Sequence, residues 1–150
     1  MSQGSSHKPN ILVPVPGSLD KEKLVLMLDK LHFLGKPNLT LFHVVEVRSR
    51  TSPLNSEFFR DAINKAEKSL KPLKKWLEKL GYKTSIKVML ARDVAEGIID
   101  EAELGGYDAI LMVRRGGRTL RNLLKTIFSG SVSEKVARHV ECPVIMVKME

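Results

Sequence analysis

The chain has 150 residues, about the length of one domain, and 25 Lys and Arg against 17 Asp and Glu give a formal net charge of +8. Hydrophobic residues make up 43% and charged residues 28%, which excludes a disordered chain. A single cysteine excludes an internal disulfide framework, and no apolar run approaches the ~20 residues that a membrane span needs. We therefore expect a cytoplasmic protein without membrane insertion. Residues 1–9 would form a flexible tail, and residues 10–150 one domain.

Five short aliphatic runs predict parallel strands that are buried on both faces, because each run is apolar at consecutive positions. In chain order they cover Ile11–Val15, Leu39–Val45, Ile86–Leu90, Ala109–Val113 and Val144–Val147.

Helical patterns fill the connections between these strands. They cover residues 20–34, 57–80, 94–104 and 132–140. Pro72 should kink or divide the second helix, Asp93 should cap the third together with Glu96, and Ser131 should begin the last in a capping box with Glu134. Strands alternating with helices predict a doubly wound α/β fold with one five-stranded parallel sheet and helices on both faces.

The positive charge is concentrated in two segments. Residues 114–125 hold five basic residues and no acid, and residues 61–83 hold seven lysines against three acids. The lysines of 61–83 fall opposite an apolar stripe, which is typical of a solvated helix face. Residues 93–108 hold six acids and no base. This patterning leaves a phosphorylated small molecule, an acidic protein or nucleic acid open as the partner.

The connection after the fourth strand is the strongest candidate binding site. Ligands of doubly wound sheets bind at the carboxyl ends of the strands. Gly130, Ser131 and Ser133 open the last helix there, where unpaired N–H groups and the helix dipole favour an anion. The five bases of residues 114–125 lie just upstream and would suit a polyphosphate. The alternative is that the two serines only cap the helix.

The remaining reactive side chains predict neither a catalytic site nor a metal site. The histidines have no metal-ligand spacing, and Cys142 stands alone. We interpret His43 as structural and Cys142 as a buried thiol. We interpret the acids from Asp93 to Glu103, with Glu101 among them, as a helix cap and a solvated helix face.

Several segments, in this order, resemble the universal stress protein family over nearly the whole chain. They are Asn10-Ile-Leu-Val-Pro-Val, Leu41-Phe-His-Val-Val-Glu46, Asp108-Ala-Ile-Leu-Met-Val, Gly130-Ser-Val-Ser-Glu-Lys-Val and Cys142-Pro-Val-Ile-Met-Val. The resemblance implies a sheet of strand order 3-2-1-4-5, a homodimer, a cytoplasmic role in stress adaptation and, in one branch of the family, ATP binding. Mg²⁺ would be bound only together with ATP.

The resemblance also implies which residues would hold the nucleotide. Pro14, Val44 and Met112 match the positions that line an adenine pocket, and Gly116, Gly130, Ser131 and Ser133 match the phosphate end. The chain departs from the ATP-binding pattern at three points. Val113 replaces the first glycine, Pro16 replaces an acid after the first strand, and thirteen residues rather than nine separate Gly116 from Gly130.

Three functions remain open from the sequence. The first is a nucleotide-binding regulatory protein, in which any ATP hydrolysis would be slow and incidental. The second is an interaction module of the same fold that docks an acidic protein or a membrane transporter through residues 114–125. The third and weakest is a nucleic-acid binder, because aromatic residues are only 5% of the chain. The edge strand 144–147, apolar on both faces, predicts a homodimer formed by pairing with its symmetry mate.

Overall fold

The computed structural model describes residues 8–16, 21–47, 57–115 and 130–149, and they form one five-stranded parallel sheet of order β3-β2-β1-β4-β5. The strands are β1 (Asn10–Pro14), β2 (Asn38–Glu46), β3 (Thr84–Ala91), β4 (Ala109–Arg115) and β5 (Val144–Met149). The helices are α1 (Lys21–Lys30), the short 3-10 helix η2 (His32–Leu34), α2 (Arg60–Lys79), α3 (Val94–Gly105) and α4 (Gly130–His139). The predicted fold class and strand order are confirmed. The assignment of residues 10–150 to one domain stays a prediction.

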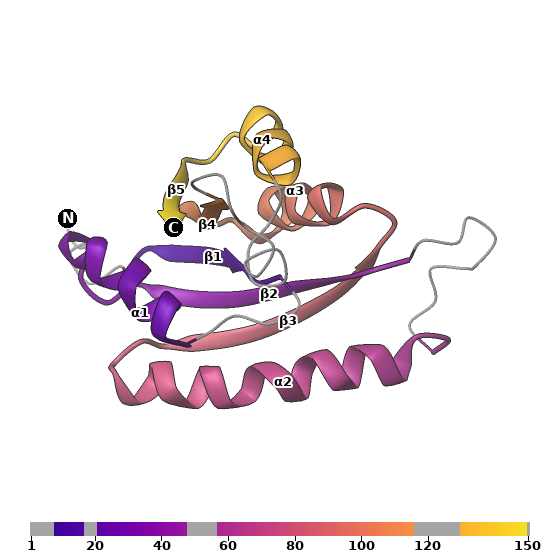
Figure 1. The fold of residues 1–150 in the computed structure, drawn as a ribbon, viewed down its shortest axis with the longest axis horizontal. Coiled ribbons are helices and arrows are strands. Elements are labelled where there is room, and N and C mark those ends of the chain that lie inside the picture. Colours follow the sequence, from indigo (N-terminus) through magenta and orange to yellow (C-terminus); the bar gives the residue numbers. More distant parts are fainter. Residues whose placement is uncertain (1–7, 17–20, 48–56, 116–129, 150) are drawn as a thin grey trace.

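The helices cover both faces of the sheet, with α1 and α2 on one side and α3 and α4 on the other (Figure 1). Side chains alternate between the faces along each strand, so each strand supplies both layers. On the first face, Leu24 of α1 and Leu70, Leu73 and Leu77 of α2 pack on the sheet. On the second face, Ile98 of α3 and Val136 of α4 do so.

Two predicted helices differ from the observed ones. The helix predicted for residues 20–34 is shorter in the structure. α1 ends at Lys30, and the 3-10 helix η2 follows it. Pro72 does not divide α2, which runs without interruption from Arg60 to Lys79. Proline removes the N–H that would bond to the carbonyl of Lys68, but Pro72 and Lys68 are both exposed, so water can satisfy that carbonyl. The buried leucines on the opposite side of α2 hold the helix against the sheet on both sides of the proline.

The order of the strands places the switch point of the sheet between β1 and β4. From β1 the chain builds outward through α1 and α2 to β3, and α3 then returns it to β4 on the other side of β1. The crevice where ligands of such sheets bind therefore opens at the carboxyl ends of β1 and β4. None of the helices in the described part of the chain is long and apolar enough to cross a membrane.

Candidate functional site

The amino end of α4 lies at this carboxyl edge, directly after the connection from β4. Gly130 is the first residue of α4, Ser131 is exposed in its first turn, and Ser133 is buried. The prediction that Ser131 caps the helix is wrong, because the backbone is already helical at Gly130. The first-turn N–H groups are those that an α-helix leaves without helical partners, and they point out of the helix end. The sequence therefore places two hydroxyl groups and a glycine at a helix end that favours an anion.

The three residues predicted for an adenine pocket are buried on one face of the sheet. Pro14, Val44 and Met112 are all buried, and their even-numbered positions place them on the same sheet face as α3 and α4. Val44 and Met112 belong to the same core cluster as Val136 of α4. The structure thus brings these three positions to one face of the sheet, beneath the helix that carries Gly130, Ser131 and Ser133. Gly116 lies outside the described residues.

Val113, which departs from the family's glycine, points away from this face of the sheet. Its side chain is buried with Val13 and Leu24 in the core on the α1 and α2 side of the sheet. The β-branched side chain therefore packs on the face opposite Met112 and α4. The second departure, Pro16, is partly buried just after β1. Residues 17–20 and 116–129, which adjoin the predicted site in the sequence, lie outside the described part of the chain.

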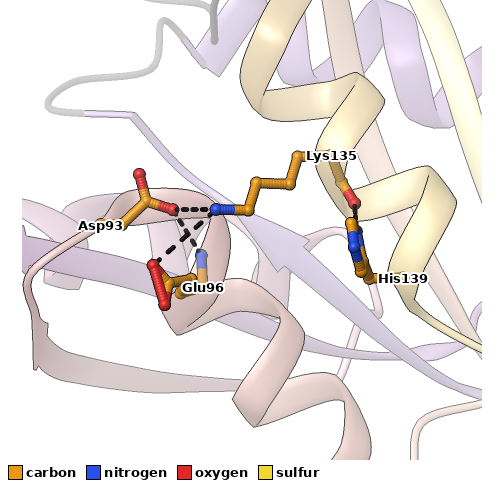
Figure 2. Close-up of polar contacts among 4 residues, drawn as sticks. All are labelled: Asp93, Glu96, Lys135 and His139. Atoms are coloured by element: carbon orange, nitrogen blue, oxygen red, sulfur yellow. Dashed lines mark hydrogen bonds and ion pairs between the residues drawn. The ribbon is translucent and has the colours of Figure 1, made fainter.

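A cluster of charges joins the amino end of α3 to the middle of α4 (Figure 2). Asp93 caps α3 as predicted, with its Oδ2 accepting a hydrogen bond from the Glu96 backbone N–H at 3.0 Å. The same oxygen lies 3.2 Å from the Nζ of Lys135 on α4, and Glu96 Oε2 lies 3.7 Å from that Nζ. One turn further along α4, His139 Nδ1 donates to the Lys135 carbonyl at 2.8 Å. The cluster holds α4 against α3 at the edge of the sheet where the candidate site lies.

Replacing Asp93 by alanine should destabilise the fold by about 1 kcal/mol, because it removes both the cap of α3 and the partner of Lys135. Asp93→Asn keeps an oxygen for the cap and loses only a half-exposed ion pair, so it should cost about 0.5 kcal/mol or less. The exposed Asp100→Ala on the same helix is the control. Urea unfolding followed by circular dichroism measures all three. Equal losses for Asp93→Ala and Asp100→Ala would contradict the role of the cap.

Glu101 was predicted to lie on a solvated helix face, and this prediction is wrong. Its side chain is only 2% exposed, its Oε2 accepts a hydrogen bond from the Tyr107 hydroxyl at 2.7 Å, and its Oε1 lies 2.7 Å from Lys87 Nζ. Oε1 has this ion pair but no well-aligned hydrogen bond, and the side chain of Lys87 is 52% exposed. Burial, and next the hydrogen bond to Glu101, raise the pKa of Tyr107 to about 12, against the weaker opposing effect of a hydrogen bond from Thr40.

His43 on β2 and Cys142, two residues before β5, occupy structural positions. His43 Nδ1 donates to the Val15 carbonyl at 2.8 Å, which ties β2 to the end of β1. Cys142 is half-buried rather than fully buried, and burial raises the pKa of its thiol, which disfavours the reactive thiolate. Among the described residues, no three His, Cys, Asp or Glu side chains are grouped closely enough to hold a metal ion.

Comparison with known proteins agrees with the fold. The Universal stress protein family matches residues 9–148. A universal stress protein of Methanocaldococcus jannaschii is 37% identical over 82 residues, which are 55% of this chain and 45% of that relative, so the match spans less than half of the relative's length.

Two solved structures share the fold along nearly the whole chain. A universal stress protein of Arabidopsis thaliana with AMP bound has a TM-score of 0.63 at 24% identity, and covers 95% of this chain and 92% of its own. A universal stress protein of Archaeoglobus fulgidus in complex with dAMP has a TM-score of 0.62 at 21% identity, and it covers 95% of this chain and 98% of its own. With the family match spanning residues 9–148 and the strand order of the sheet, the chain belongs to the universal stress protein family.

Proposed function

We propose that this chain is a regulatory protein that binds an adenine nucleotide, AMP or ATP, at the carboxyl edge of the sheet. The observation that carries the proposal is the position of α4. Its amino end, with Gly130, follows β4 at the switch point of the sheet, and its Val136 packs in the same core cluster as Val44 and Met112. The AMP and dAMP complexes of the Arabidopsis and Archaeoglobus proteins support the same ligand class.

The chemistry of the edge is suited to such a ligand. The apolar side chains of Pro14, Val44 and Met112 would lie beneath a planar base, while the N–H groups of the first turn of α4 and the exposed Ser131 would face the phosphate oxygens. Val113 leaves this face free because its side chain packs on the other side. With ATP, Mg²⁺ would neutralise part of the phosphate charge. We propose binding as the function and not turnover, with hydrolysis slow and incidental.

The proposal predicts that Gly130→Val weakens AMP binding at least tenfold, which is about 1.4 kcal/mol. A β-branched side chain at the first residue of α4 would keep the phosphate away from the backbone N–H groups. Ala137→Val is the matched control, because Ala137 is exposed on the same helix and distant from its amino end. Calorimetric titration of each purified variant measures the affinity. Equal affinities for wild type and Gly130→Val would count against the site.

We also propose that the chain forms a homodimer through β5. This strand lies at the edge of the sheet, and its Val144, Ile145 and Met146 are each partly exposed. Pairing with a second copy would cover both the unpaired backbone and these side chains. Sedimentation should give the mass of a dimer for wild type and of a monomer for Met146→Lys. The control Leu104→Lys, at a side chain 83% exposed on α3, should stay dimeric. A monomeric wild type would refute the dimer.

The alternative function is a partner-docking module without a nucleotide. The described part of the basic segment 114–125 is the end of β4, where Arg114 pairs in register with Lys148 of β5. The rest of the segment lies beyond the described residues. A wild-type chain that binds no adenine nucleotide but binds an acidic protein, and loses that binding when residues 114–125 are neutralised, would establish this alternative.

A further inference from the structure

The side chains that α2 places against the sheet are large in its second half and small in its first half, and the first half leaves a hollow beside the sheet. In the second half, Leu70, Leu73 and Leu77 fill the space against the strands. In the first half, the positions that face the end of β2 carry alanine and serine instead. The resulting hollow, which we call the α2 hollow, has a volume of about 370 Å³ and is lined by His43, Val44, Val45, Glu46, Ala62, Lys65, Ala66 and Ser69. This volume lies in the range of small-molecule sites.

The α2 hollow is separate from the proposed nucleotide site. His43 and Val45 occupy odd-numbered positions of β2, so their side chains lie on the face that α2 covers. The side chain of Val44 belongs to the core on the opposite face, under α3. Strand β2, paired along its length with β3 and over its first half with β1, stands between the two sites. A ligand in the α2 hollow would therefore not occupy the space of the nucleotide.

Two polar groups of the α2 hollow are available to a ligand. The Val15 carbonyl can only accept a hydrogen bond, so Nδ1 of His43 carries a proton, and in the neutral ring Nε2 is left as an acceptor. Lys65 lines the hollow, is exposed, and forms no ion pair with any acid in the described part of the chain. The Ser69 hydroxyl already donates to the Ala66 carbonyl at 2.8 Å. The hollow thus offers one uncommitted cation beside a mainly apolar floor.

We propose that the α2 hollow binds a small organic anion with an apolar body, of the aromatic carboxylate class. The ring would lie on Val45, Ala62 and Ala66 beside the imidazole of His43, and the carboxylate would pair with Lys65. The lining carries one acid, Glu46, and that residue already has another polar contact, so Lys65 is the charged group of the hollow that is left to pair with an anion. The burial of apolar surface supplies the affinity, and the lysine selects the sign of the ligand's charge.

The test uses the fluorescent dye anilinonaphthalene sulfonate, an aromatic anion, with the full chain. We expect saturable binding of one dye per chain, displacement by naphthoate, and no displacement by the neutral naphthamide or by AMP. Ala66→Leu fills the hollow and should weaken dye binding at least tenfold, while Lys65→Gln should weaken it several-fold. Lys68→Gln, an exposed lysine of α2 outside the hollow, is the matched control and should bind as wild type does.

Each other result overturns the proposal. Dye binding that is unchanged by Ala66→Leu would place the dye on another apolar surface, such as the exposed ring of Phe33. Equal displacement by naphthoate and naphthamide would show that Lys65 does not select a negative charge. The absence of any saturable signal would show that the hollow does not bind the dye. Circular dichroism and thermal unfolding of Ala66→Leu confirm that the variant is folded, so that a loss of binding reports on the hollow and not on the fold.

Discussion

Replacing Gly97 by valine should destabilise the protein by about 2–3 kcal/mol. At Gly97, α3 lies close against the sheet. A Cβ added there would lie 2.9 Å from Cγ2 of Val44 and 3.2 Å from the Cβ of Ala91. Both neighbours are short side chains on strands, so neither can move aside without shifting β2 or β3. The helix would have to lift from the sheet, which would open the core around Ile98.

Two further variants separate this packing effect from helix propensity. Gly97→Ala gains about 1 kcal/mol of helix propensity and loses more to the same close contact, so it should be destabilising by roughly 1 kcal/mol. Ala137→Val places the same β-branched residue on an exposed helical position and should cost only about 0.5 kcal/mol. Denaturant unfolding gives the free energies. A loss for Gly97→Val no larger than that for Ala137→Val would contradict the close packing of α3.

Glu101→Ala should destabilise the fold by about 2 kcal/mol. The substitution leaves the half-buried hydroxyl of Tyr107 without its acceptor, opens a small cavity under α3, and removes the ion pair with Lys87. The ion pair itself contributes little, because solvent screens the half-exposed lysine. Glu103→Ala, an exposed acid on the same helix, is the control and should change stability by less than about 0.5 kcal/mol.

The same variant should change the alkaline titration of Tyr107. The pKa of Tyr107 is raised from 10.0 to about 12, first by burial and second by its hydrogen bond to Glu101. A raised pKa in the folded state means that the group stabilises the fold below pH 10 and that this stability is lost as the pH rises through 12. In Glu101→Ala the midpoint should move down toward 10.0, with a weaker loss of stability at high pH.

Ultraviolet absorbance of tyrosinate measures this midpoint directly. The chain has two tyrosines, so Tyr82→Phe is the background in which Tyr107 titrates alone. A Tyr107 midpoint that stays at the same pH when Glu101 is replaced would show that burial alone raises the pKa. A change of only the unfolding free energy, without movement of the midpoint, would point to the cavity and not to the hydrogen bond.

Hydropathy was sufficient to predict the fold class, because five short aliphatic runs alternate with amphipathic helical patterns. The strands β1 and β4, for example, begin within one residue of the predicted runs at Ile11 and Ala109. The cap of α3 was also predictable, since Asp93 precedes Glu96 by the spacing of a helical cap. The strand order came from the resemblance to the family and not from hydropathy, which does not specify which strands are neighbours.

The sequence failed to predict the environment of a residue where a polar residue type occupies a buried position. Glu101 is an acid, but it follows Ile98 by three residues and precedes Ala102, so it lies on the buried stripe of α3. Its spacing could have revealed its burial. Its partners could not be read from helix spacing, because Lys87 lies on β3 and Tyr107 lies beyond the end of α3. The sheet face on which Val113 packs was predictable only from the alternation of side chains along β4. Val113 and Met112 are neighbours in the strand, so their side chains lie on opposite faces.

Nucleotide binding by this chain is tested most directly by calorimetric titration of the purified wild-type protein with AMP, after acid extraction has identified any ligand that was already bound. We predict saturable binding of one nucleotide per chain, and loss of at least tenfold in affinity in Gly130→Val but not in Ala137→Val. If no nucleotide is extracted and no titration heat is seen up to millimolar AMP or ATP, the chain has the fold of a universal stress protein but does not bind the nucleotide proposed here.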